Sequence, residues 1–357
     1  MDKILIVKTS ALGDVVHTYP VISYLKRKFP HAQIDWVVES QSLSLVQSHP
    51  DITKAIPIAT KTWRQSLFNK KTFRAVQSFI RELRSTEYDV VFDLQGNVKS
   101  GLITAIAKSK TKVGFGFHSA PETPNILFTN RKFDPQPNRG IREDYLSIVS
   151  AFFGEDADIL DHSSVQLNIS KEENLHLQNI MARDGQVVLV CPGSAWPNKQ
   201  VTTESLQEFL FLVNQQMRCQ FLFAWGSPEE KQIALTLQQK FTGSKVIDKL
   251  NLASLQNLMG MCDLVIAMDS LPLHLAATTK TKTFSIFGAS SAKKYKPPGA
   301  DHSAFQGACP YGRLFEKRCP VLRKCPTGAC IRNLSGTAIF ESFSKNRSAS
   351  ETGLNRT

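Results

Sequence analysis

Residues 3–14, KILIVKTSALGD, determine the fold more than any other stretch of this sequence. Their first half centres on a run of four apolar, mainly β-branched residues, which is typical of a parallel strand buried on both faces. A turn of small residues follows, and over residues 15–25 apolar side chains recur every three or four positions, as on one face of a helix. Pro20 lies inside this helical pattern and is expected to kink it. A strand that leads through a tight turn into a helix is the opening unit of an α/β sheet.

The same alternation continues along the chain. Further strands are predicted at 34–38, 90–94, 187–191, 221–225, 264–267 and 283–287, and helices at 72–85, 203–217 and 228–241. The polar, acidic segment 154–164 interrupts the alternation, so we predict one doubly wound domain on each side of it. The predicted domains are residues 1–160 and 165–335, followed by a terminal helix and a loose polar tail over 336–357. That helix, at about 337–345, is expected to pack back toward the first domain.

The composition excludes several classes of protein. Hydrophobic residues make up 42% and charged residues 21% of the 357-residue chain, values of an ordinary globular protein rather than a disordered or fibrous one. No run approaches the roughly 18 apolar residues of a membrane-spanning helix, and the apolar stretch near the N-terminus is too short for a secretory signal. We therefore expect a cytoplasmic protein.

The charge is strongly positive and unevenly distributed. The net charge is +12; residues 61–84 carry seven Lys or Arg against Glu82 alone, and residues 293–357 carry twelve against four acidic residues. Such a surface favours anionic partners: nucleic acid, an anionic membrane face or a phosphorylated substrate. A role in solubility alone is the simplest alternative explanation.

The first polar motif, KTSALGD at residues 8–14, leads from the first strand into the first helix. Gly13 permits the tight turn, and Asp14 lies at the start of the helix. A carboxylate there can take a proton from a substrate hydroxyl, and the helix dipole favours its ionised form. Aspartate is also a preferred helix cap, so a purely structural role is equally compatible with the spacing. The motif is not a Walker loop, because Gly-Lys-Ser/Thr is absent.

Two further motifs follow predicted strands, where α/β proteins bind ligands. The loop DLQGNVKS (residues 93–100) suits contact with a polyhydroxylated ligand, although an ordinary capped strand–helix loop has the same pattern. In PGSAWPNK (residues 192–199), a glycine–serine turn offers backbone donors. Lys199 in that motif is either a cation for a diphosphate or a solvated surface residue.

A fourth motif, MDSLPLH at residues 268–274, also follows a strand. Ser270 is a candidate helix cap, and the helix start behind it can hold an anion. Asp269 and His274 would face the same site, whereas a histidine buried between helix and sheet is the alternative. Residues 287–291, FGASS, add small residues and hydroxyls at the same rim.

The seven cysteines fall into two groups. Three are scattered in apolar context and are interpreted as buried thiols: Cys191, Cys219 and Cys262. The other four cluster within 22 residues: Cys309, Cys319, Cys325 and Cys330. A cytoplasmic location argues against disulfides, and the spacing matches no paired CxxC zinc pattern. Reduced thiols in a basic loop and a structural metal site both remain open, and no metal ligand is assigned.

Taken together, these segments resemble glycosyltransferase family 9, the ADP-heptose:lipopolysaccharide heptosyltransferases. The likeness rests on residues 6–20, on DWVVE at 35–39 and on the stretch 88–100, and it continues with NRK at 130–132. It runs from residue 1 to about 343 and is more specific in the N-terminal half.

The resemblance implies a GT-B fold, in which two Rossmann-like domains face each other across a cleft. The N-terminal domain would bind the acceptor and the C-terminal domain the ADP-sugar. The family enzymes are inverting and displace ADP directly at the anomeric carbon; we expect no cofactor and no metal. The implied reaction moves heptose from ADP-heptose to the Kdo region of lipid A in lipopolysaccharide core biosynthesis. Addition of a later core heptose, or of another sugar, is the alternative.

The resemblance and the charge pattern together assign residues to roles. Asp14 matches the general base of the family. The predicted donor-binding residues are Ser194, Lys199, Glu229, Asp269, Ser270 and His274. The predicted acceptor-binding residues are Lys8, Ser10, Gly13, Lys61, Arg64, Gln95, Lys99 and Arg131. Two positions depart from the family pattern: Leu271 replaces a glycine, and Pro228 displaces the acidic residue that follows Trp225 and Gly226.

The expected partners are the ADP-heptose donor, a Kdo-lipid A acceptor and the anionic surface of the inner membrane, with the enzyme peripheral on the cytoplasmic face. No nucleic acid is expected. A basic nucleic-acid- or membrane-surface-binding protein is the competing hypothesis. It explains the charge but not the polar motifs after the strands, and no nucleic-acid-binding motif is present.

Overall fold

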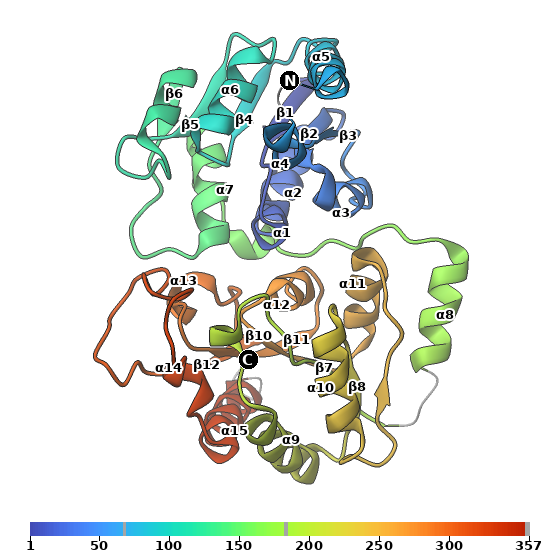
Figure 1. Cartoon of the computed structure of the whole chain (residues 1–357). Coiled ribbons are helices and arrows are strands. Elements are labelled where there is room, and N and C mark those ends of the chain that lie inside the picture. The colour runs from blue at the N-terminus through green and yellow to red at the C-terminus, as the bar shows by residue number, and fades with distance from the viewer. Residues whose placement is uncertain (67–68, 182–184, 354–357) are drawn as a thin grey trace. The chain divides into compact units, whose positions relative to one another are not determined.

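The computed structural model describes residues 1–66, 69–181 and 185–353, and the chain divides into two compact units, Met1–Asn168 and Ile169–Thr357. Each unit is built on a six-stranded sheet with helices packed around it (Figure 1). The sheet orders are β3-β2-β1-β4-β5-β6 and β12-β11-β10-β7-β8-β9, with every strand pair parallel. Counted from the first strand of its own unit, each sheet has the order 3-2-1-4-5-6 of the doubly wound fold. The predicted α/β class with two Rossmann-like units is confirmed.

The first unit alternates strands and helices along the chain. Its strands are β1 (Lys3–Val7), β2 (Gln33–Glu39), β3 (Lys54–Ile58), β4 (Val90–Asp93), β5 (Lys112–Phe115) and β6 (Arg131–Phe133). Its α-helices are α1 (Leu12–Val16), α2 (Tyr19–Lys28), α3 (Leu43–Gln47), α4 (Thr60–Gln65), α5 (Lys70–Leu83), α6 (Val98–Ile106) and α7 (Ile141–Phe152). Short 3₁₀ turns are η1 (Ser40–Ser42), η2 (Thr123–Phe128) and η3 (Ile159–His162). The apolar β1 run is fully buried, as expected for a central strand covered on both faces.

The second unit repeats the pattern. Its strands are β7 (Val187–Cys191), β8 (Gln220–Phe223), β9 (Lys245–Val246), β10 (Leu264–Met268), β11 (Lys282–Phe287) and β12 (His302–Gln306). Its helices are α8 (Lys171–Met181), η4 (Pro197–Lys199), α9 (Thr203–Met217), α10 (Pro228–Gln238), α11 (Leu252–Met261), α12 (Leu271–Ala276), α13 (Ala292–Tyr295), α14 (Ala329–Arg332) and α15 (Gly336–Gly353). Within the described residues, no helix is long and apolar enough to cross a membrane.

Three local expectations differ from the structure. Pro20 does not kink one helix; the chain breaks between α1 and α2, and Pro20 lies in the first turn of α2, where its missing N–H is not needed. The acidic segment 154–164 ends in η3, which packs on α2, so the units divide later, after Asn168.

The terminal helix α15 belongs to the second unit. Ile339 and Phe343 of α15 are buried in the core of the second unit, where the ring of Phe343 packs edge to face against those of Phe209 and Phe284. The helix also continues to Gly353 rather than ending near 345. Residues 354–357 of the predicted loose tail lie outside the described residues.

Candidate active site

The candidate residues of the first unit gather where β1 and β4 end side by side. Gln95, just after β4, reaches across to the loop after β1. Its Oε1 accepts hydrogen bonds from the backbone N–H of Thr9 (3.1 Å) and of Ser10 (3.0 Å). Gln95 therefore fixes the turn that leads the chain into α1.

Asp14 is the third residue of α1 and stabilises the start of that helix. Its Oδ2 accepts a hydrogen bond from the backbone N–H of Ala11 at 3.1 Å; Ala11 occupies the cap position, so Asp14 supports the helix start from the third helical position and not as the N-cap that the sequence suggested. Oδ1 makes no hydrogen bond within the part of the chain that the structure describes. Asp14 and the neighbouring Gly13 are half-buried. One carboxylate oxygen thus serves the helix, while the other is available to take a proton.

Lys8, predicted to contact the acceptor, is instead almost fully buried. Its Nζ donates hydrogen bonds to the Leu94 carbonyl oxygen (3.0 Å) and to the Tyr145 hydroxyl oxygen (2.7 Å). Burial lowers the pKa of Lys8 to about 8, against the opposing effect of the Asp14 and Asp93 carboxylates. Lys8 therefore ties the end of β1 to Leu94 and Tyr145 from inside the sheet edge.

The carboxylate of Asp93 organises the loop after β4. It is fully buried and accepts four hydrogen bonds, from Gln95 N, Gly96 N, Ser100 Oγ and Asn125 Nδ2, at 2.7–3.0 Å. Burial raises the pKa of Asp93, and these donors work in the opposite direction. The 93–100 loop is therefore an ordered scaffold for the neighbouring Gln95.

The predicted basic residues are only partly brought together. Lys99 Nζ lies 3.3 Å from Glu39 Oε1 and 2.9 Å from Thr60 Oγ1, at the carboxyl ends of β2 and β3. Lys61 and Arg64 follow Thr60 in α4 and are exposed. All of these residues lie at the same edge of the sheet as Asp14, because the strands are parallel.

Arg131 lies elsewhere. It is the first residue of β6, so it stands at the amino end of a parallel strand, and its side chain is exposed. The structure thus leaves Arg131 outside the group formed by the other predicted acceptor residues.

In the second unit, three loops bring a charged cluster to the carboxyl edge of the sheet. Asp269 directly follows β10, and its Oδ2 is bound by Lys199 Nζ from η4 and by Ser290 Oγ from the loop after β11. His274 Nε2 of α12 lies 3.4 Å from Asp269 Oδ1. All four side chains are buried.

The electrostatics of this cluster favour an ionised aspartate. Burial opposes the charge of Asp269, but the hydrogen bond from His274 and the charge of Lys199 outweigh it, so the pKa of Asp269 lies well below its usual range. Lys199 is therefore not the solvated surface residue that the sequence left open. It is a buried cation held against a carboxylate, with Ser194, also buried, in the same loop.

The start of α12 differs from a plain capped helix. Ser270 occupies the cap position, but its hydroxyl donates to the Met268 carbonyl oxygen (3.3 Å) and makes no capping hydrogen bond. Leu271, in place of the family glycine, is half-buried at the first position of the helix.

The two acidic residues at the start of α10 differ in position, and the one predicted from the sequence is not the one that faces the sheet. Glu229 is exposed beside Ser227. Glu230, one residue later, turns back toward the sheet: its Oε2 accepts a hydrogen bond from Gly226 N at 2.6 Å. Its carboxylate also lies so close to Gly193 that a Cβ at that position would collide with it. Glu230, not Glu229, is therefore the carboxylate next to the loop after β7.

Comparison with known proteins agrees with the family resemblance. The chain matches the model of glycosyltransferase family 9 (heptosyltransferase) over residues 76–324. The chain belongs to this family.

Curated relatives and solved structures support the same family. Lipopolysaccharide heptosyltransferase 1 of Escherichia coli strain K12 is 26% identical over 80% of this chain and 88% of its own length. The Pseudomonas aeruginosa protein of the same name is 28% identical over 80% of this chain and 78% of its own length. The solved structure of the E. coli heptosyltransferase WaaC with ADP-2-deoxy-2-fluoro heptose matches 96% of this chain and 99% of its own, with a TM-score of 0.77 at 22% identity. The fold is therefore the GT-B fold of these transferases.

Three functional candidates in this family 9 enzyme were not assigned from the sequence. The sequence places the hydroxyls of residues 287–291 at this rim but does not single out Ser290, which follows β11 by three residues, as a partner of Asp269. Glu230 differs from Glu229 by one helical position, which a motif interrupted by Pro228 does not resolve. Tyr145 contacts Lys8 from a distance of 137 residues along the chain, and no local pattern announces such a contact.

Proposed function

We propose that this family 9 enzyme transfers heptose from ADP-heptose to the Kdo region of lipid A, as a lipopolysaccharide heptosyltransferase of type 1. The observation that carries the proposal is the buried cluster of Lys199, Asp269, Ser290 and His274, which follows three adjacent strands of the second unit. Support comes from the names of the relatives and from the nucleotide-sugar analogue in the similar WaaC structure.

The proposed donor site lies on the second unit. Lys199 and the loop around Ser194 take the diphosphate, because a fixed cation offsets the charge that develops on the leaving group. Asp269, which binds Lys199 directly, holds that cation in place. Glu230 replaces Glu229 as the proposed acceptor of hydrogen bonds from the ribose hydroxyls.

The proposed chemistry begins on the first unit. Asp14 takes the proton of an acceptor hydroxyl, and the oxygen attacks the anomeric carbon of the heptose. The bond between that carbon and the phosphate oxygen breaks at the same time, and ADP leaves. The direct displacement inverts the anomeric configuration. Gln95, Ser10 and Gly13 shape the turn beside Asp14, and Lys99, Lys61 and Arg64 supply cations at the same edge for the anionic acceptor.

The proposed location is the membrane surface that holds the acceptor. Lipid A is anchored in a bilayer, so an enzyme that glycosylates it must work at that surface. The exposed cations of α4 and α5 suit an anionic bilayer face, which attracts Lys and Arg at about 1 kcal/mol each. No partnership with nucleic acid is proposed.

The test is a measurement of ADP release from ADP-heptose with Kdo-lipid A as the acceptor, using the full chain. We expect turnover that requires both substrates and a product heavier by one heptose. UDP-sugars serve as donor controls, and a lipid A acceptor that already carries one heptose separates the type 1 reaction from later core additions. Turnover only with the heptosylated acceptor, or only with another nucleotide sugar, would contradict the proposal.

A further inference from the structure

The loop between β12 and α14 contains three of the four clustered cysteines and has little regular structure of its own; the fourth, Cys330, lies in α14. It runs over residues 307–328 without a helix or a strand, and one isolated bridge joins Arg318 to Ser290. Loops of this length without internal secondary structure are uncommon in compact domains and call for another source of order.

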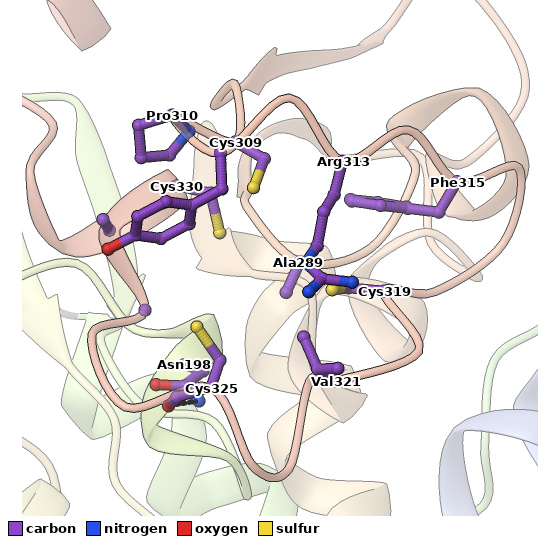
Figure 2. A pocket seen from close by; sticks show the side chains of 13 residues that line it. Asn198, Ala289, Cys309, Pro310, Arg313, Phe315, Cys319, Val321, Cys325 and Cys330 are labelled. Carbon is purple, nitrogen blue, oxygen red and sulfur yellow. Dashed lines mark hydrogen bonds between the residues drawn. The ribbon is translucent and has the colours of Figure 1, made fainter.

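The loop closes around a small cavity. The cavity has a volume of about 30 Å³, and all four cysteines line it: Cys309, Cys319, Cys325 and Cys330. Figure 2 shows their side chains around this common space, together with Asn198 from the donor-site loop. A space of this size accommodates one water-sized particle.

Two of the cysteines begin the same short motif. Residues 309–312 read Cys-Pro-Tyr-Gly and residues 325–328 read Cys-Pro-Thr-Gly. The glycine has a positive φ in both, 67° at Gly312 and 58° at Gly328, a conformation that glycine adopts without strain. In the second motif the backbone N–H groups of Gly328 and Thr327 donate to Cys325 Sγ. Hydrogen bonds of this kind orient the sulfur of a metal-bound cysteine.

The charge of the surrounding loop favours thiolates. Residues 309–332 carry six Lys or Arg and one acidic residue, Glu316. Four thiolates around a divalent cation carry a net charge of −2, which this loop is suited to neutralise.

We propose that Cys309, Cys319, Cys325 and Cys330 form a closed tetrathiolate site for one divalent zinc or iron ion. Four sulfur ligands in tetrahedral geometry select these metals, and each thiol releases its proton when it binds. As they stand, no three His, Cys, Asp or Glu side chains among the described residues form a ready coordination sphere. Binding therefore requires the four thiols to move toward the common cavity that they line.

The proposed metal would order the donor site through the loop that packs against Asn198 and Ala289. Asn198 Nδ2, next to Lys199, donates hydrogen bonds to the carbonyl oxygens of Leu322 (2.8 Å) and Cys325 (2.9 Å). On the other side of the loop, Cys319 N donates to the Ala289 carbonyl oxygen at 2.8 Å, beside Ser290. The loop thus supports two of the side-chain segments that surround Asp269, and the ion has a structural rather than a catalytic role.

The first experiment measures metal content, which does not depend on the transferase activity. The full chain is expressed in medium that contains zinc and iron, purified without chelators under reducing conditions, and analysed by mass spectrometry of the elements. We expect one zinc or iron ion per chain in the wild type and in Cys219→Ser, which removes a thiol outside the cluster. Cys325→Ser should lose most of the metal. Equal metal content in Cys325→Ser and the wild type would overturn the assignment.

The second experiment needs no variant to fold. Cobalt(II) is titrated into wild-type protein from which metal has been removed. Intense sulfur-to-cobalt charge-transfer absorption that saturates at one equivalent, with release of protons, is the expected result. Absence of that absorption, or a non-reduced protein whose mass shows a disulfide among the four cysteines, would overturn the proposal.

Discussion

In each unit a lysine follows the first strand of the sheet and an aspartate lies at the end of the fourth. The two pairs differ in their hydrogen-bond partners and in their charge. Lys8 follows the first strand of the first unit, and Asp93 ends the fourth. In the second unit, Lys199 lies in the loop after the first strand, and Asp269 follows the fourth. Because strands one and four are neighbours in both sheets, each pair lies at the point where the strand order reverses.

The charge states of the two pairs differ because their neighbours differ. Asp93 is bound by neutral donors, and burial raises its pKa. Lys8 donates to a carbonyl and a phenol, and burial lowers its pKa to about 8. Lys199 binds Asp269 directly, and the pKa of that aspartate is lowered. The fold thus determines where an ionisable side chain lies, whereas contacts with side chains from distant segments determine whether its pKa is raised or lowered.

The largest expected effect is on kcat, when the proposed base of the first unit is replaced while the proposed ADP site of the second unit is left intact. Asp14→Asn removes the proposed base but keeps a side-chain oxygen that can accept the hydrogen bond from Ala11 N at the start of α1. We expect kcat to fall by about 10²–10⁴-fold, with the affinity for ADP and the melting temperature close to wild type. Steady-state kinetics, calorimetric titration with ADP and thermal unfolding measure the three quantities.

Asp14→Ala is the matched control for the structural role at the start of α1. It lacks both functions, so it should lose activity and also about 1 kcal/mol of stability. If Asp14→Asn turned over at the wild-type rate, Asp14 would have the structural role alone and the first unit would need another base.

The next effect compares the two aspartates directly. Asp269→Asn leaves Lys199 buried opposite a neutral amide, so we expect the free energy of unfolding to fall by about 3–5 kcal/mol. Asp93→Asn keeps a group of the same shape among neutral donors, but its amide NH₂ cannot accept a hydrogen bond. About one donor therefore loses its partner, which lowers the free energy of unfolding by about 1–2 kcal/mol. Denaturant unfolding of both variants measures the difference. Equal losses would mean that Asp93 is as strongly tied to a cation as Asp269, and the contrast between the units would disappear.

The third effect concerns the pH dependence of stability. Because Lys8 has a pKa of about 8 in the folded protein and 10.5 when free, the unfolded chain binds the extra proton between these values. Stability contributed by Lys8 therefore rises with pH from about 8 to about 10.5, by at most about 3 kcal/mol. Lys8→Met should lose this rise, so the stability difference between wild type and variant must change across that range. A constant difference would show that Lys8 remains charged, and the two lysines would then behave alike.

Much of this arrangement could be predicted from the sequence, because strand ends carry strong local signals. The strand 187–191 and the helix 203–217 were predicted with the bounds that the structure shows. The pattern predicts that Asp269 lies at the carboxyl edge of the sheet, because polar residues directly after buried strands collect there, whereas the family resemblance is what assigns Asp269 and Lys199 to the donor site.

The contacts between these residues could not be predicted, because they join distant segments. The ion pair of Lys199 and Asp269 spans 70 residues, and neither local pattern shows that both side chains are buried. Arg131 was grouped with the acceptor residues by its charge, but the short strand β6 places it at the amino end. Along a helix, consecutive side chains point about 100° apart. The sequence therefore does not show which of Glu229 and Glu230 faces the sheet, because that depends on where the helix begins in three dimensions.

That choice gives the smallest expected effect and the sharpest test of the proposed donor site. Glu230 packs on Gly193 and binds Gly226 N, whereas Glu229 is exposed on the same helical turn. If the carboxylate of Glu230 accepts a hydrogen bond from the ribose, Glu230→Gln should weaken ADP binding by roughly tenfold, because a charge-assisted bond becomes a neutral one. Glu229→Gln, one residue away with the same change of charge, should leave ADP binding unchanged.

A second comparison uses calorimetric titration of both variants with ADP and with adenosine diphosphate that lacks the 2′-hydroxyl. The deoxy nucleotide should bind wild type and Glu230→Gln with nearly equal affinity, because the lost hydroxyl removes the same contact. A tenfold loss in Glu229→Gln, with Glu230→Gln unaffected, would return the ribose contact to the residue that the sequence motif suggested.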